Sequence, residues 1–134
     1  MCICTIKERW SMSEEKQKLL YILNNAGEQA ERVLTAFALA NIGVSMEHDV
    51  TVIVFGEATR LVYKGYAGTV HSPERLPLDK LISDFLAGGG RILVCLPCIK
   101  ARKVTTDQLI EGVEATTGTV VNDCILEADK VISF

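Results

Sequence analysis

The chain of 134 residues has few aromatic residues, no strong excess of charge and no long apolar run. Aromatic residues make up 6% of the sequence and hydrophobic residues 49%, which favours an aliphatic α/β core over an aromatic-rich β sandwich. The net charge of −3 gives no reason to expect a nucleic-acid partner. No apolar run reaches the length that crosses a bilayer, so no membrane partner is expected either.

The first residues also lack the apolar core of a signal peptide. Met1-Cys2-Ile3-Cys4 is followed by charged residues from Lys7 to Arg9, so the cytoplasm is the expected compartment. We expect residues 1–15 to form an N-terminal arm and residues 16–134 to form one domain of common size.

The cysteines make a poor disulfide framework because their number is odd and their spacing uneven. The five are Cys2, Cys4, Cys95, Cys98 and Cys124. Cys2 and Cys4 are too close together for the usual zinc pair, although a site of four thiolates with Cys95 and Cys98 is an alternative. No nucleotide or zinc motif is present, so we expect no cofactor and no metal. Cys124 is expected in the core.

Strand and helix patterns alternate along the chain. Strands are expected at 18–23, 49–56, 92–94, 115–118 and 131–134, and helices at 28–42, 57–62, from 77, from 105 and at 120–128. Gly43 is interpreted as a helix stop, and Thr105 with Gln108 fits a capping box at a helix start. The alternation predicts a flavodoxin-like α/β/α sandwich of three layers, with a mostly parallel five-stranded sheet and the first strand central.

The segment from Gly88 to Thr106 holds the main chemical signal. Three glycines precede the apolar run at 92–94, and Cys95-Leu96-Pro97-Cys98 follows it. Proline is favoured in the first turn of a helix, so Cys95 should end a strand and Cys98 should lie in the first helical turn. In an open α/β sheet this edge is where ligands bind.

A thiol in such a turn is expected to ionise easily. Helix N–H groups and the charges of Lys100, Arg102 and Lys103 should lower its pKa, which predicts a reactive thiolate. Two buried structural cysteines, or half of a metal site, are the alternatives. Lys100 and Arg102 are candidates for binding an anionic substrate, and a solvated surface charge is the alternative for each.

Three further residues are candidates for the lining of the substrate site. Tyr66 and His71 lie in a loop that could cover the cysteine edge, and Asn25 follows the first strand. For Asn25, capping of the following helix is the preferred alternative.

Three segments resemble the DsrE/DsrF-like family of small sulfur-relay proteins, which includes the YchN-like fold. Residues 90–95, Gly-Arg-Ile-Leu-Val-Cys, are similar to the family's strand that ends in a sulfur-carrying cysteine. Residues 98–102, Cys-Ile-Lys-Ala-Arg, are similar to its C-x-x-Ala-Arg helix start, and residues 126–134 resemble its closing segment. Many members have glycine where this chain has Lys103.

The resemblance implies that Cys95 carries sulfur, as persulfide or thiosulfonate, between protein thiols and that Cys98 assists. It implies sulfur-donor and acceptor proteins, among them a TusA-like carrier, a link to thiosulfate, and a homo-oligomer, either a trimer or a hexamer. Whether the chain is an enzyme or only a carrier stays open. The alternatives are a C-x-x-C dithiol–disulfide oxidoreductase, which the spacing also fits, and a non-catalytic oligomeric module.

Overall fold

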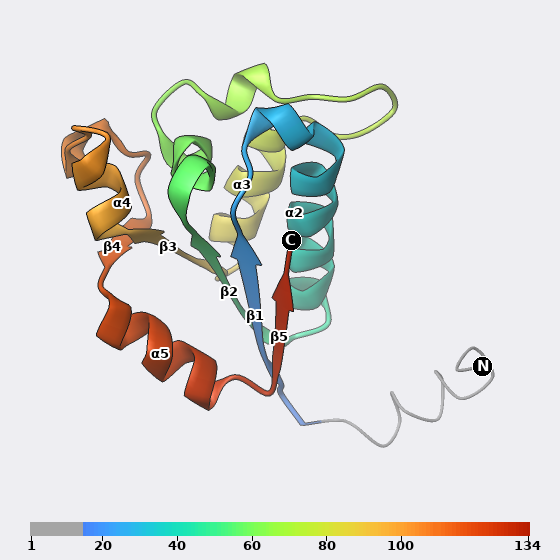
Figure 1. The fold of residues 1–134 in the computed structure, drawn as a ribbon. Helices are drawn as coiled ribbons and strands as arrows, with labels where there is room; N and C mark the ends of the chain where they lie inside the picture. The colour runs from blue at the N-terminus through green and yellow to red at the C-terminus, as the bar shows by residue number, and fades with distance from the viewer. Residues whose placement is uncertain (1–14) are drawn as a thin grey trace.

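The computed structural model describes residues 15–134, so most of the expected arm, with Cys2 and Cys4, lies outside the described residues. The strands are β1 Lys18–Leu23, β2 Asp49–Val54, β3 Arg91–Cys95, β4 Val113–Thr116 and β5 Lys130–Ser133. All pairs are parallel and the order is β4-β3-β2-β1-β5 (Figure 1). The predicted α/β class with a five-stranded parallel sheet is confirmed.

Helices cover both faces of this sheet. The α-helices are α2 Ala30–Ser45, α3 Leu78–Ala87, α4 Leu96–Ala101 and α5 Gly118–Glu127, and the 3-10 helices are η2 Gly27–Gln29, η3 Gly56–Val62, η4 Ala67–Thr69 and η5 Thr106–Gln108. Helices α2 and α3 lie on one face and α5 on the other, while α4 sits at the edge where the strands end (Figure 1). Right-handed crossovers explain why the helices lie on opposite faces. The chain crosses the sheet in one direction from β1 to β4, and it crosses back in the opposite direction from β4 to β5.

The position of the first strand differs from the prediction. Strand β1 has a neighbour on each side, β2 and β5, but the middle of the sheet is β2. Three successive crossovers in one direction place two strands beyond β2, whereas the single return adds only one strand beyond β1. No helix in residues 15–134 is long and apolar enough to cross a membrane.

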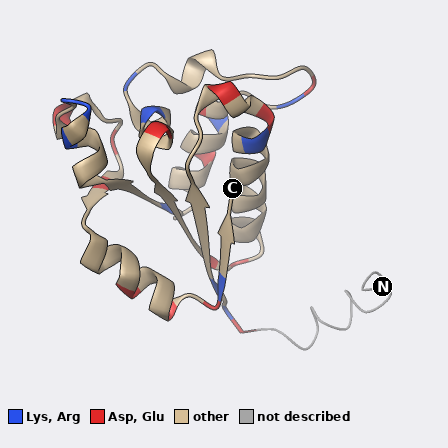
Figure 2. Ribbon diagram, viewed as in Figure 1, with Lys and Arg blue, Asp and Glu red and all other residues tan. Residues whose placement is uncertain are grey.

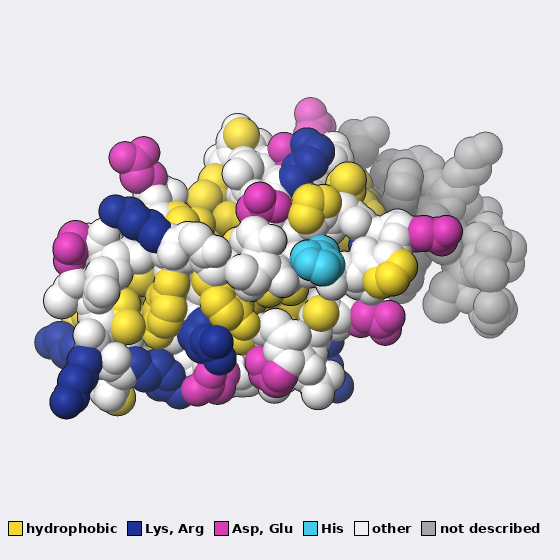
Figure 3. All heavy atoms as spheres, turned by 90° about the horizontal axis from the view of Figure 1, so that it is seen from above, with side chains coloured by type: hydrophobic (Ala, Val, Ile, Leu, Met, Phe, Trp, Pro, Cys, Tyr) yellow, Lys and Arg dark blue, Asp and Glu magenta, His cyan; other side chains and the backbone are white. Residues whose placement is uncertain are grey.

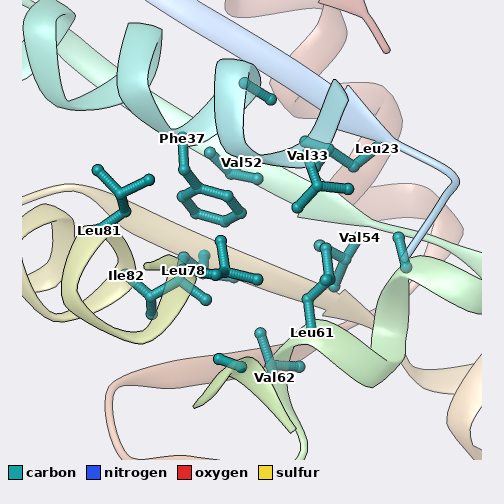
Figure 4. Close-up of a cluster of buried hydrophobic side chains, with 14 of the residues drawn as sticks. Leu23, Val33, Phe37, Val52, Val54, Leu61, Val62, Leu78, Leu81 and Ile82 are labelled. Carbon is teal, nitrogen blue, oxygen red and sulfur yellow. The ribbon is translucent and has the colours of Figure 1, made fainter. Parts of the chain in front are cut away.

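The face under α2 and α3 carries most of the buried side chains (Figure 4). Phe37 of α2 and Phe85 of α3 are fully buried and meet edge to face, with ring centroids 6.0 Å apart. The Asn41 amide of α2 donates to the backbone carbonyls of Phe37 and Leu81 at 2.9 Å, which ties α2 to α3. The two helices therefore form one packed layer.

Gly43 does not stop α2, so that prediction was wrong. The helix continues to Ser45, and Gly43 is buried inside it. A Cβ at Gly43 would lie 2.9 Å from Cγ2 of Val50 in β2, so the missing side chain lets the helix approach the sheet. The chain reverses instead at Glu47, whose φ of 68° is in the left-handed region.

The capping box at Thr105 and Gln108 forms as predicted, but it opens only the three-residue η5. Leu109 is buried and pairs antiparallel with Tyr63, and the Ile110 N–H donates to the Val62 carbonyl at 2.9 Å. These contacts draw the chain away from a helical path, and β4 then starts at Val113 rather than at residue 115. Tertiary pairing overrides the local helix signal here.

The face under α5 is covered less completely. Its buried cluster consists of Leu20, Ile53, Leu93 and Val121, with Cys124 half-buried against it rather than fully in the core. Several large apolar side chains of α5 and β5 are exposed, namely Val120, Ile125, Leu126, Val131 and Ile132. One ten-residue helix leaves part of this face open.

Candidate functional site

Cys95 and Cys98 lie where the sequence placed them. Cys95 is the last residue of β3 and the N-cap of α4, and Cys98 is the third residue of that helix, with Pro97 between them. Both thiols are free and half-buried. The sulfur of Cys95 is thus neither sealed in the core nor fully open to solvent.

Strand alternation decides which face Cys95 belongs to. Leu93 is part of the cluster under α5, and the residue two positions further along a strand points to the same side. Cys95 pairs in register with Thr116 of β4, which is 4% exposed. Phe55, after β2, is half-buried on the same cluster. Strand alternation therefore assigns Cys95 to the incompletely covered face, and Figure 3 shows apolar side chains exposed between charged ones at the edge where the strands end.

The expected lowering of the Cys95 pKa is not what the structure shows. Burial raises the pKa of the Cys95 thiol, and so do the hydrogen bond to the Cys98 thiol and the negative charge that Cys98 carries when ionised. The Cys98 N–H and the charge of Arg102 lower this pKa, but they do not outweigh the other effects. The prediction counted the helix N–H groups and the neighbouring cations, whereas burial is the largest effect on this thiol and α4 has only six residues.

Arg102 is the cation held closest to this turn by contacts in the structure. Its Nη1 donates to the Cys98 carbonyl at 3.2 Å, and its Nη2 pairs with Oε1 of Glu57 at 3.2 Å. Lys100 is exposed in the last turn of α4 and makes no salt bridge among residues 15–134. Lys100 and Arg102 are the two cations predicted to bind an anion. Of the two, Arg102 is the one whose side chain hydrogen-bonds to a cysteine residue, at the Cys98 carbonyl.

Glu57 links Arg102 to a second cation along the edge of the sheet. Its Oε2 accepts from Nη1 of Arg60 at 3.3 Å, and the hydrogen bonds from Arg102 and Arg60 hold the pKa of Glu57 below its usual range. Arg60 lies over the ring of Tyr66, 4.8 Å from its centroid, and the Gly27 N–H donates to Tyr66 Oη at 2.9 Å. Figure 2 shows basic and acidic residues side by side on η3 and at the end of α4.

The other predicted lining residues lie apart from the thiols. Asn25 donates to Oε1 of Glu28 at 3.2 Å, and Glu28 accepts from the Ala26 N–H at 3.0 and 3.1 Å. Asn25 does not cap the following helix, because Ala26 is the N-cap of η2 and no side-chain hydrogen bond caps it. His71 is exposed after η4 and has no hydrogen bond to the described part of the site. Tyr66 reaches the cysteines only through Arg60, Glu57 and Arg102.

Sequence reasoning missed Glu57 and Arg60. Both lie in η3, directly after β2, and parallel strands end at one edge of the sheet. Their spacing of three residues also places them side by side on one helical turn. The strand-end rule that selected Cys95 would have selected Glu57 as well.

The chain is thus a small α/β protein with a parallel sheet and a pair of thiols at the end of its third strand. Comparison with known proteins identifies its family. The model of the DsrE/DsrF-like family matches residues 17–134, and the chain belongs to this family. Members are in general sulfur-relay proteins. The resemblance of the three sequence segments is thereby confirmed.

Two archaeal proteins are similar to the chain in sequence. MK0008 of Methanopyrus kandleri is 27% identical over 114 residues, which cover 84% of this chain and 90% of the relative. MJ0760 of Methanocaldococcus jannaschii is 29% identical over 96 residues, which cover 71% of this chain but 35% of that longer protein.

Solved structures support the fold. The ychN protein of E. coli has a TM-score of 0.76 at 24% identity and covers 88% of this chain and 99% of its own. MTH1491 of Methanobacterium thermoautotrophicum has a TM-score of 0.70 at 16% identity, with 89% and 100% covered. The predicted YchN-like fold is confirmed.

Proposed function

We propose that the protein is a sulfur carrier that moves persulfide or thiosulfonate sulfur between protein thiols through Cys95, assisted by Cys98. The observation that carries the proposal is the pair of free, half-buried thiols at the carboxyl end of β3 in a chain of the DsrE/DsrF-like family. Arg102 adds a cation on the same helix.

Loading is a displacement at sulfur in which the Cys95 thiolate is the nucleophile. With thiosulfate, the Cys95 thiolate attacks the outer sulfur, the S–S bond breaks, and sulfite leaves with its electron pair while Cys95 becomes a persulfide. The persulfide is an anion at neutral pH, and we expect the charge of Arg102, which lowers the pKa of Cys95, to favour this anion as well. Transfer repeats the step, with the acceptor thiolate attacking the outer sulfur and Cys95 leaving as thiolate.

Cys98 can release the load within the molecule. The Cys98 thiol gives its proton to the outer sulfur of the Cys95 persulfide and its sulfur attacks the inner one, so that a Cys95–Cys98 disulfide forms, the S–S bond of the persulfide breaks and hydrosulfide leaves. The spacing supports this assisting role, because Cys95 is the N-cap of α4 and Cys98 is the third residue of that helix. The substrate-binding roles of Lys100, Asn25, Tyr66 and His71 stay predictions, since no contact joins these side chains to the thiols.

The expected partners are a sulfur donor and an acceptor protein, with a TusA-like carrier as one of them. The exposed apolar residues of α5 and β5, such as Leu126 at 83% exposure, support the prediction of a homo-oligomer. A trimer or hexamer in the cytoplasm stays the expectation from the family resemblance.

The test is the intact mass of the protein after incubation with thiosulfate, tetrathionate or polysulfide. We expect a sulfur adduct in the wild type and in Cys98→Ser, and none on the same site in Cys95→Ser. Cys124→Ser is the matched control, because Cys124 is also free and half-buried but lies on α5. An adduct that persists in Cys95→Ser contradicts the proposal.

A dithiol–disulfide oxidoreductase is the second candidate, favoured by two free thiols in C-x-x-C spacing at the start of α4. For this activity the same experiment gives a loss of two hydrogens and no added sulfur. A non-catalytic oligomeric module would show neither change, and its Cys95 would resist labelling by thiol reagents.

A further inference from the structure

The Arg102 guanidinium makes two hydrogen bonds, and one of them is more easily broken than the other. One nitrogen binds the Cys98 carbonyl, a backbone atom of the cysteine helix, and the other binds the Glu57 carboxylate. The first contact keeps the guanidinium beside α4. The second can be exchanged, because Glu57 is 51% exposed and Arg102 33% exposed, and ion pairs this exposed contribute little net free energy.

Glu57 is also shared between two cations. Arg60 pairs with its second carboxylate oxygen at 3.3 Å and has another partner in the Tyr66 ring. The cluster of Arg102, Glu57 and Arg60 therefore holds two positive charges and one negative charge. The charge of Arg102 lowers the pKa of Cys95, so it favours an anion there, but Nη2 of this guanidinium already binds the Glu57 carboxylate.

We infer that Glu57 sets the charge selectivity of the cysteine site, because it occupies the Arg102 guanidinium until an anionic sulfur group on or near Cys95 displaces it. The inference rests on the proposed function of Cys95 and makes Glu57 a positioning residue that acts through Arg102. The planar guanidinium suits this exchange, since its fork of donors binds carboxylates and oxyanions of sulfur or phosphorus in the same geometry. Cys95 then reacts with anionic sulfur compounds, but more slowly than it would if Arg102 had no ion pair with Glu57.

The test compares an anionic with a neutral disulfide reagent on Cys95 alone. The background variant carries serine at the other cysteines, Cys2, Cys4, Cys98 and Cys124. Tetrathionate transfers a thiosulfonate group to the Cys95 thiolate and releases thiosulfate, whereas 2-hydroxyethyl disulfide forms a mixed disulfide and releases 2-hydroxyethanethiolate. Both reactions need the same thiolate, so the ratio of their rates cancels any change in the pKa of Cys95.

We expect Glu57→Gln to raise the ratio of tetrathionate rate to neutral-disulfide rate about two- to fivefold, because the guanidinium is no longer neutralised. Glu114→Gln is the matched control. It removes one carboxylate of similar exposure, paired with Arg91 at 3.2 Å on β3, and should leave the ratio unchanged. Added salt should shrink the gain.

A double variant separates the Arg102 route from bulk charge. In Arg102→Gln the Glu57→Gln substitution should no longer raise the ratio, whereas Glu57→Asp should keep it near the background value. An equal rise with Glu57→Gln and Glu114→Gln, or a rise that survives in Arg102→Gln, overturns the inference. If Glu57→Gln has no effect while Cys95 still takes up sulfur, the inference fails and the proposed function stands. If wild-type Cys95 takes up no sulfur, the proposed function fails instead.

Discussion

The two faces of the sheet differ in how fully helices cover them and in what they carry. Under α2 and α3 the buried layer includes the fully buried rings of Phe37 and Phe85, whereas under α5 four buried residues form the whole cluster within residues 15–134. Cys95 belongs to the second face. The dense packing therefore lies on one side of the sheet, and the half-buried Cys95 lies at the end of β3 on the side that stays partly open.

The largest effect is expected from removing a ring of the packed face. Phe37→Ala should lower the free energy of unfolding by about 3–5 kcal/mol, because Phe37 is fully buried and the surrounding side chains cannot close the cavity. Val121→Ala under α5 should cost about 1–2 kcal/mol, since fewer atoms are lost and the site is 8% exposed. Urea unfolding of both variants measures the two costs, and equal values would contradict the difference between the faces.

Adding an atom to the packed face should also be costly. A Cβ at Gly90 would lie 2.3 Å from the Phe85 ring, so Gly90→Ala should destabilise the protein by about 1–3 kcal/mol through overpacking.

The cause can be isolated with a second substitution at the ring. In a Phe85→Leu background the cost of Gly90→Ala should be smaller, because the side chain that is struck has been shortened. The four free energies of unfolding form a double-mutant cycle. A cost that is the same in both backgrounds would show that the ring is not responsible.

On the open face the expected effect concerns reactivity and not stability. Burial and Cys98 raise the pKa of the Cys95 thiol above its ordinary value of 9.0, so the thiolate fraction is small at neutral pH and grows only as the pH rises through this higher value. Cys98→Ala removes the side chain that raises this pKa and keeps the backbone N–H that lowers it. The pH profile of Cys95 alkylation should therefore move to lower pH.

The measurement is the rate of alkylation of Cys95 by iodoacetamide between neutral and alkaline pH, followed by mass. Cys124→Ala should leave the profile in place, because Cys124 is not among the groups that shift this pKa. A profile that moves to higher pH in Cys98→Ala would show that Cys98 lowers the pKa of Cys95 instead.

Most of the order of elements could be predicted from the sequence, because β1, β2 and β3 are short β-branched or apolar runs, whereas β4, Val113–Thr116, is not and was predicted two residues too late. The same patterns located Cys95 at a strand end and Cys98 in the first helical turn. Gly43 was misjudged, since a glycine that ends a helix and one that admits a close neighbour look alike until the facing Val50 is known.

The electrostatics of the site were harder to predict from the sequence than the position of the cysteines. The pKa of Cys95 depends on burial by residues from other strands, and the partner of Arg102 lies 45 residues away in the chain. Neither can be derived from the charges adjacent to the C-x-x-C motif. Glu57 follows a strand end, so its location was predictable, but its contact with Arg102 requires the register of β2 and β3.

The smallest expected effect concerns the turn that ends the cysteine helix. Helices α3 and α4 end in the same way, with a residue of positive φ whose N–H bonds back into the last turn, but α3 uses Gly89 at 100° and α4 uses Lys103 at 58°. A residue with a side chain pays about 1–2 kcal/mol for this conformation, which glycine does not. The turn forms with Lys103 at this position, and the Val104 N–H bonds to the Ile99 carbonyl at 2.9 Å.

Lys103→Gly should therefore raise the free energy of unfolding by up to about 1 kcal/mol, part of the gain being lost to the greater freedom of glycine in the unfolded chain. Lys103→Ala is the control, since it removes the same charge and keeps the strained backbone, and it should change stability little. If both variants gain equally, the lysine charge and not the backbone is responsible. If only Lys103→Gly raises the free energy of unfolding, the turn after α4 carries backbone strain at Lys103. The turn after α3 avoids this strain, because it has glycine at the same position.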